Sequence, residues 1–140
     1  MNELHEHIVV KSGSNALKEA EGKLKEILDA LNLSDSEEHN LLVATSEAIN
    51  NAISHGNKND PGKNVMLDID CAGVEIAITV EDEGGGFNPS TVPDPLAPEN
   101  LLKPSGRGIH IMKSLMDKVD FTFTRHGTRI TMRLKIAKAS

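Results

Sequence analysis

The apolar residues in the first part of the chain recur at helical spacing. Between Ser14 and Leu31 they fall three and four residues apart, which places them on one stripe of a helix. The next segment opens with Ser34-Asp35-Ser36-Glu37, a capping-box pattern that marks a helix start. A second helix is therefore predicted from Ser34 to about His55, with Gly56 as its natural stop.

Strict alternation of apolar and polar residues follows and predicts strands. Residues 65–71 and 74–80 both alternate, and only Ala72-Gly73 separates them, so they should pair as an antiparallel hairpin. The same alternation returns in 121–134 around a turn at Arg125-His126-Gly127. A short edge strand is expected around Glu6 to Val10. The pattern thus predicts a sheet of about five strands.

A third helix and a long loop complete the predicted layout. The helix is entered near Gly106, and its apolar stripe is Ile109, Met112, Leu115, Met116 and Val119. The loop, residues 87–104, holds five of the 6 prolines, and loops of this length in a compact domain are usually functional lids or disordered. Together the elements predict an α+β fold, a mixed but mostly antiparallel sheet covered on one face by three helices.

Composition narrows the class of protein. The 140 residues fit a single domain, 1–140, with ordinary fractions of 38% apolar and 26% charged residues. A net charge of −6 and 3 Phe as the sole aromatic residues disfavour nucleic acid as a partner. The single cysteine, the polar N-terminus and the lack of a long apolar run favour a cytoplasmic protein that does not enter a membrane.

Three polar residues are spaced by four on the second predicted helix: Glu47, Asn51 and His55. They share one side of that helix, at the edge of its apolar stripe. The amide oxygen of an asparagine is a ligand for a hard cation such as Mg²⁺, and a carboxylate one turn away can accept a proton. Taken alone, such a row is more often a solvated helix face.

Two glycine-rich segments flank the proline-rich loop. Before it, Asp82 precedes Gly84-Gly85-Gly86, where a carboxylate can accept a hydrogen bond from an amine such as that of adenine. After it, Gly106-Arg107-Gly108 precedes the third helix, whose free amides and dipole favour a phosphate. An acidic turn and an ordinary connection to a helix are the structural alternatives.

The order of these segments is more specific than any one of them. Residues 47–56 read EAINNAISHG, and they are followed by Asp82 with its glycines, then by residues 106–108, and finally by Gly127-Thr128. In this order the chain resembles the GHKL superfamily of histidine-kinase-like ATPases, with its N box, two glycine boxes and late Gly-Thr pair. The EAxxNAxxHG pattern is most similar to bacterial anti-sigma-factor serine kinases. The resemblance covers nearly the whole chain and implies a Bergerat-type two-layer sandwich with an ATP lid at about 87–106.

The resemblance also implies a role for each motif residue. Asn51 would coordinate Mg²⁺, and Glu47 would act as the base or orienting group. Asp82 would bind the adenine amine with help from Thr128, while Gly84 and Gly86 would let the base approach. The triphosphate would be capped by Gly106, Arg107 and Gly108. Lys103 stands further back than the basic residue that family members often carry just before the second glycine box, so the cation for the γ-phosphate is left open.

The function implied is an ATP-dependent serine/threonine-protein kinase and anti-sigma regulatory factor. It would phosphorylate a small anti-anti-sigma, STAS-type partner, sequester a sigma factor, and form a homodimer. One alternative is an ATP-binding regulatory module without kinase activity, which would have no need of Glu47 as a base. The other is the catalytic part of a two-component histidine kinase, which would need a further helix pair. The 6 histidines match no zinc spacing, and a structural metal is not expected.

Overall fold

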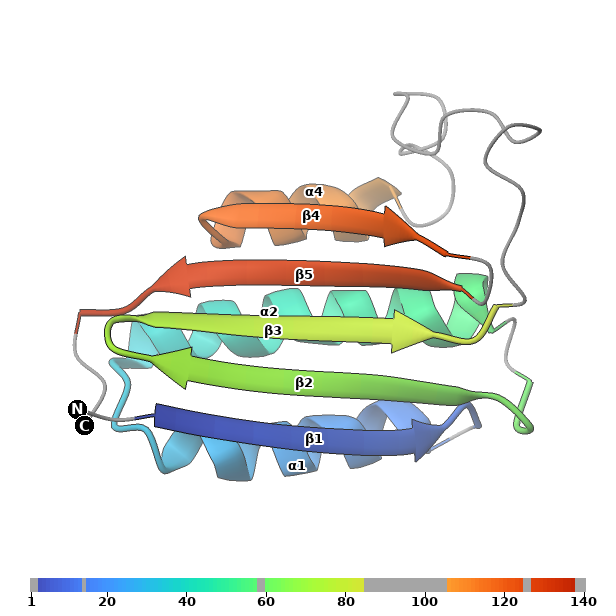
Figure 1. Ribbon diagram of the computed structural model, residues 1–140, viewed down its shortest axis with the longest axis horizontal. Helices are drawn as coiled ribbons and strands as arrows, with labels where there is room; N and C mark the ends of the chain where they lie inside the picture. The colour runs from blue at the N-terminus through green and yellow to red at the C-terminus, as the bar shows by residue number, and fades with distance from the viewer. Residues whose placement is uncertain (1–2, 14, 58–59, 85–105, 125–126, 138–140) are drawn as a thin grey trace.

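Among the residues that the computed structural model describes, five strands and three α-helices form two layers (Figure 1). The described residues are 3–13, 15–57, 60–84, 106–124 and 127–137. The elements are, in chain order, β1 (Glu3–Lys11), α1 (Ala16–Asp29), α2 (Asp35–Asn51), the π-helix η1 (Ala52–Gly56), β2 (Asn64–Ala72), β3 (Glu75–Asp82), α4 (Gly106–Leu115), β4 (Lys118–Phe123) and β5 (Thr128–Lys135). The predicted α+β fold, with an open five-stranded sheet and three helices, is confirmed.

The strands lie in the order β1-β2-β3-β5-β4. All four pairs of described strands are antiparallel, so the sheet contains no parallel pair where a mixed sheet was expected. The β2–β3 connection uses Gly73 and Val74, one residue later than predicted, because Ala72 still pairs with Glu75. Gly73 has φ of 63°, which glycine adopts without the strain that a side chain would bring.

The three α-helices cover one face of the sheet. In Figure 1 all of them lie behind the strands, and α2 packs between α1 and α4. The predicted capping box begins α2: the Glu37 amide donates to Ser34 Oγ at 3.1 Å, and the Ser34 amide donates to Glu37 Oε1 at 2.9 Å. The other oxygen of Glu37 accepts from the Ala137 amide at 2.6 Å, which ties the start of α2 to the chain after β5.

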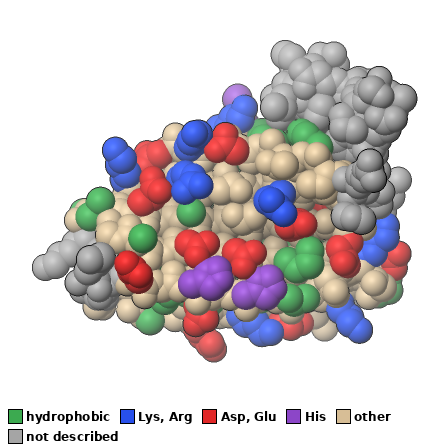
Figure 2. All heavy atoms as spheres, in the orientation of Figure 1, with side chains coloured by type: hydrophobic (Ala, Val, Ile, Leu, Met, Phe, Trp, Pro, Cys, Tyr) green, Lys and Arg blue, Asp and Glu red, His purple; other side chains and the backbone are tan. Residues whose placement is uncertain are grey.

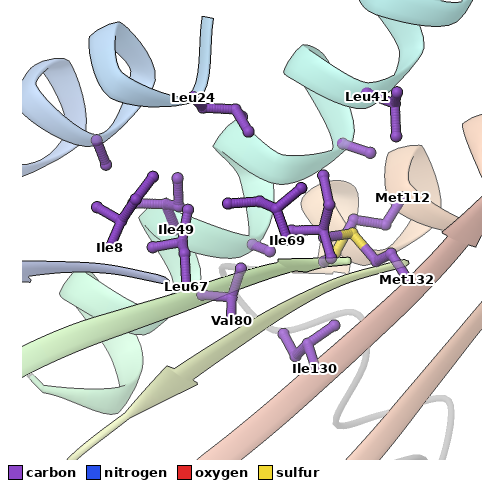
Figure 3. Close-up of a cluster of buried hydrophobic side chains, with 14 of the residues drawn as sticks. Ile8, Leu24, Leu41, Ile49, Leu67, Ile69, Val80, Met112, Ile130 and Met132 are labelled. Carbon is purple, nitrogen blue, oxygen red and sulfur yellow. The ribbon is translucent and has the colours of Figure 1, made fainter. Parts of the chain in front are cut away.

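Apolar side chains from both layers meet between the helices and the sheet (Figure 3). Leu24 of α1, Leu41 and Ile49 of α2 and Met112 of α4 are fully buried against strand residues such as Ile69. Burying an aliphatic side chain of this size contributes about 1.5–3 kcal/mol, so each of these residues is a substantial source of stability. The helical and strand periodicities of the sequence therefore converge on one core.

The other face of the sheet is polar, and no helix formed by the described residues lies on it. Figure 2 shows charged side chains of both signs over this face, with histidines next to acidic residues. The registers explain the pairs: His7 lies opposite Asp68, with Nδ1 to Oδ1 at 2.8 Å, and His5 pairs in the same way with Asp70. No helix in the described part of the chain is long and apolar enough to cross a membrane.

One helix boundary differs from the prediction. The third helix ends at Leu115, and Val119, expected on its apolar stripe, lies in β4 instead. Asp117 lies in the connection between α4 and β4, and its amide donates to the Arg133 carbonyl of β5 at 2.9 Å. This bond holds the start of β4 against β5. The second helix does continue through His55, but its last turn is the π-helix η1.

Candidate functional site

Four of the residues singled out from the sequence, Asn51, Asp82, Gly106 and Thr128, lie where their elements begin or end at one end of the molecule. This is where α2 and β3 end and where β5 and α4 begin, on the right in Figure 1. Asn51 is the half-buried last residue of α2, and Asp82 is the last residue of β3. Gly106 is the first residue of α4, and Thr128 is the first of β5. Segments far apart in the sequence thus contribute to one site.

The three consecutive acidic residues at the end of β3 have three different environments. Glu81 lies on the face without helices and accepts from Arg129 Nε at 3.0 Å. Glu83 accepts from the Asn64 amide at 2.5 Å. Asp82 points to the helical side and is 6% exposed. Alternation along the strand therefore isolates Asp82 as the buried carboxylate of this segment.

Backbone amides hold the Asp82 carboxylate in place. The Thr128 amide donates to Asp82 Oδ1 at 3.1 Å, and the Gly84 amide donates to the same oxygen at 3.0 Å. No residue in the described ranges donates to Oδ2. Asp82 therefore has one oxygen fixed by the protein and a second that can accept a hydrogen bond from a ligand.

Three glycines make room for Asp82. A Cβ at Gly56 would lie 2.1 Å from Asp82 Oδ2, and a Cβ at Gly127 would lie 2.1 Å from the Asp82 backbone oxygen. A Cβ at Gly84 would lie 2.5 Å from the Gly56 carbonyl oxygen. Since the backbone of Gly56 does not have a positive φ, its place at the end of the helix is explained by contact with Asp82, not by a left-handed turn.

Burial also changes the acidity of this residue. Desolvation raises the pKa of Asp82 above its ordinary value of 3.8, while the hydrogen bonds from the Thr128 and Gly84 amides act in the opposite direction. The nearby Glu81 carboxylate adds to the increase in pKa. A buried carboxylate without a full set of hydrogen-bond donors lowers the stability of the fold. Such groups concentrate at functional sites.

The helices α2 and α4 bring Glu47 and Gly108 into direct proximity. A Cβ at Gly108 would lie 2.9 Å from Glu47 Oε2, so a side chain there would displace the Glu47 carboxylate. Glu47 is half-buried and Gly108 is buried. Gly108 lies in the first turn of α4, where backbone amides have no partner within the helix. A carboxylate and a helix N-terminus suited to phosphate therefore lie next to each other.

The turn after α2 is built around Asn57, a residue that the sequence analysis did not single out. The Asn57 amide donates to the Ala52 carbonyl at 2.8 Å, which closes the π-helical turn, and the residue is fully buried. Its side chain donates to Ser12 Oγ at 2.7 Å and to the Asn64 carbonyl at 2.9 Å. Its Oδ1 accepts from the Glu83 amide at 2.7 Å. Asn57 and Asp60 lie in a polar stretch that is typical of any loop, so no sequence signal marked this residue.

Several predicted features lie outside the described residues. Gly86 and the greater part of the predicted lid at 87–106 belong to this group, as do the side chains of His55 and Arg107. Within the described ranges, no group of three or more His, Cys, Asp or Glu residues could hold a metal ion.

The chain belongs to the histidine kinase-like ATPase domain family, whose model matches residues 11–134. It is 39% identical to the anti-sigma F factor of Clostridium perfringens strain SM101 over 98 residues, which are 66% of this chain and 69% of that protein. It is 34% identical to the anti-sigma F factor of Anoxybacillus flavithermus over 99 residues, 67% of this chain and 66% of that one. The resemblance inferred from the motif order is thereby confirmed.

Solved structures support the fold. The RsbU and RsbW domains of Rv1364c from Mycobacterium tuberculosis match with a TM-score of 0.71 at 18% identity, over 100% of this chain and 33% of that one. The histidine kinase domain of the blue-light activated histidine kinase EL346 from Erythrobacter litoralis matches with a TM-score of 0.59 at 17% identity, over 91% of this chain and 62% of that one. The chain thus spans a third of the first of these proteins.

Proposed function

We propose that this chain is an ATP-binding anti-sigma regulatory factor that phosphorylates a serine or threonine of a small partner protein. The observation that carries the proposal is the buried Asp82 carboxylate, enclosed by Gly56, Gly84 and Gly127, with Oδ1 fixed by two amides. A buried carboxylate of this kind can accept a hydrogen bond from the amine of adenine. It would bind a base that has no donor at that position much more weakly.

The remaining site residues have distinct tasks in this proposal. Asn51 would hold magnesium, which would neutralise phosphate charge when bound. Gly106 and Gly108 would present the amides of the first turn of α4 to phosphate oxygens, with Arg107 next to them. Gly84 and Gly86 would allow the base to approach, and Thr128 would hold Asp82 through its amide.

Glu47 would act on the acceptor hydroxyl. Because Glu47 lies against Gly108, its carboxylate would be close to the terminal phosphate, where it could accept the proton of a serine or threonine. A bond would form between the hydroxyl oxygen and the γ-phosphorus of ATP. The bond from that phosphorus to the bridging oxygen would break, and ADP would leave with the bridging oxygen. Phosphoryl transfer needs mainly positioning and charge stabilisation, so these few groups are sufficient in kind.

The proposed partners follow from the anti-sigma F factors to which the chain is similar. We infer a STAS-type anti-anti-sigma protein as the phosphate acceptor, a sigma factor as the sequestered protein, and a homodimer as the binding unit. In this proposal ATP and ADP binding would decide which partner is held. A regulatory module without kinase activity would bind the same nucleotides but would leave Glu47 without a task.

Two measurements test the proposal in sequence. Calorimetric titration with ATP and ADP, with and without Mg²⁺, tests nucleotide binding without knowledge of a partner. Transfer of labelled phosphate from ATP to purified STAS-type proteins then tests kinase activity, with Glu47→Gln as the inactive control. Failure of the wild type to bind either nucleotide would remove the proposal. Binding without transfer to any acceptor, and equal partner binding by Glu47→Gln, would favour the regulatory module.

A further inference from the structure

Asn57 is a fully buried polar side chain in which every hydrogen-bonding group has a partner. Its two side-chain N–H groups donate to Ser12 Oγ and to the Asn64 carbonyl, and its Oδ1 accepts from the Glu83 amide. Its own amide and carbonyl bond to Ala52 and Asp60. A buried network with this degree of satisfaction fixes one arrangement, because each alternative leaves a polar group without a partner.

The three side-chain partners of Asn57 belong to three different parts of the fold, and Asn57 itself belongs to a fourth. Ser12 follows β1, Asn64 begins β2, and Glu83 directly follows Asp82 at the end of β3. Asn57 itself closes the π-helical turn that continues α2, the helix of Glu47 and Asn51. Of these contacts, the hydrogen bond from the Glu83 amide joins the end of β3, which carries Asp82, to the turn that continues α2. Glu83 is the residue next to Asp82.

We propose that Asn57 is a positioning residue for nucleotide binding, which holds the strand end carrying Asp82 against the end of the helix carrying Asn51 and Glu47. The inference rests on the proposed function and extends it to a residue that contacts no nucleotide. A bound nucleotide would engage Asp82 through its base and Asn51 through its phosphates. Both contacts form at full strength only if the two residues keep a fixed separation.

The π-helical turn supports this assignment. Such turns are rare and occur often at functional sites, since they insert one extra residue into the helix. Here the turn brings Gly56 against Asp82 and Asn57 against the Glu83 amide at the same time. If residue 57 only filled space in the core, an apolar side chain would be sufficient, and the hydrogen bond from the Glu83 amide to Asn57 Oδ1 would not be needed.

The test compares two variants with the wild type by calorimetric titration with ADP in the presence of Mg²⁺. Asn57→Ala removes the acceptor of the Glu83 amide. Misplacement on the order of 1 Å can lower a reaction rate by about 100-fold, and we take the same factor as the upper limit for the loss of binding. We expect the Kd of Asn57→Ala to rise by about 10- to 100-fold. Ser12→Ala is the matched control: it removes one partner of the Asn57 amide group but leaves the bond to Glu83.

Stability and positioning are separated by what the titration reports. A variant that is less stable but still almost entirely folded at the temperature of the titration binds with nearly the wild-type Kd, because the apparent Kd rises only by the inverse of the folded fraction. We expect this for Ser12→Ala, and the folded fraction of each variant is measured by thermal unfolding under the same conditions. The wild-type Kd in Asn57→Ala would overturn the proposal. If Asn57→Ala shows no cooperative unfolding, Asn57→Ser takes its place, because its short hydroxyl leaves room for water and does not reach Glu83.

Hydrogen exchange in the wild type gives a check that needs no variant. The Glu83 amide should exchange slowly before any nucleotide is added, because its acceptor is buried. Rapid exchange at this amide in the free protein would overturn the proposal. Failure of the wild type itself to bind ADP would instead count against the proposed function.

Discussion

Replacing Asp82 by asparagine should separate stability from function. The amide side chain of the Asp82→Asn variant keeps an oxygen for the Thr128 and Gly84 amides, because turning that side chain over would place N–H against two N–H donors. Its nitrogen therefore takes the place of Oδ2. In the variant the side-chain nitrogen would direct an N–H at the adenine amine. In the wild type the carboxylate oxygen at this position would accept a hydrogen bond from that amine.

The loss of binding can be estimated from this geometry. A hydrogen bond to a charged group contributes about 1.5–3 kcal/mol, and two donors left facing each other add a further penalty. A total of about 2–4 kcal/mol corresponds to a Kd for ADP that rises by about 30- to 700-fold. Calorimetric titration measures this change directly.

Stability should change in the opposite direction. Because the pKa of Asp82 is raised in the fold, ionisation of this group is less favourable in the folded state than in the unfolded chain. Its protonated form stabilises the fold below the unfolded pKa, and that contribution is lost as pH rises through the raised folded pKa. At pH 7 Asp82→Asn should therefore be more stable than the wild type, because the neutral amide places no desolvated charge in this buried position.

Thermal unfolding without nucleotide tests this second expectation. For a domain of this length, about 1 kcal/mol moves Tm by roughly 3–5 °C, and the difference between the two proteins should narrow as the pH is lowered through the titration window of Asp82. Asp120→Asn makes the same chemical change at an exposed carboxylate and should change neither Kd nor Tm. Wild-type ADP affinity in Asp82→Asn, or a lower Tm at pH 7, would refute the reasoning.

Three further variants test other parts of the site and fold. Asn51→Ala should bind ADP equally with and without Mg²⁺ in calorimetric titration; a retained Mg²⁺ dependence would place the ion elsewhere. Gly108→Ala should move the Glu47 carboxylate, the flexible group it would meet, and so lower phosphoryl transfer more than ADP affinity; unchanged transfer would argue against a role for Glu47. Ser34→Ala should lower the free energy of unfolding by about 1 kcal/mol in denaturant titration, with no change in ADP binding, because it removes the cap of α2 alone.

Local patterns in the sequence predict most of the helices and strands. The capping box at Ser34 and the alternation in β2 and β3 depend on neighbours in the chain, and both are confirmed. Val119 was misassigned because its spacing from Leu115 also fits a helical stripe. Its place in β4 depends on pairing with Met132, which helical periodicity does not register.

The candidate site was less accessible to sequence reasoning, because its contacts join distant segments. Motif order identified Asp82 and Thr128, but the need for glycine at position 56 becomes clear only when the Asp82 carboxylate is seen against it. Asn57 gave no signal, since a buried asparagine and a solvated one look the same in a polar stretch. Ser12 and Glu83, which directly follow β1 and β3, enclose it from distant parts of the sequence.

The pairing of β3 with β5 has a consequence for the order of folding. β2 and β3 form a hairpin of neighbouring segments, whereas β5 reaches β3 only after the intervening chain has closed a long loop, a step that slows folding. The surroundings of Asp82 are complete only when Gly127 and Thr128 have arrived with β5. ADP should therefore bind after the rate-limiting barrier, so that it slows unfolding and leaves the refolding rate nearly unchanged. Stopped-flow experiments with and without ADP measure both rates, and the nucleotide should stabilise the completed fold without assisting its formation.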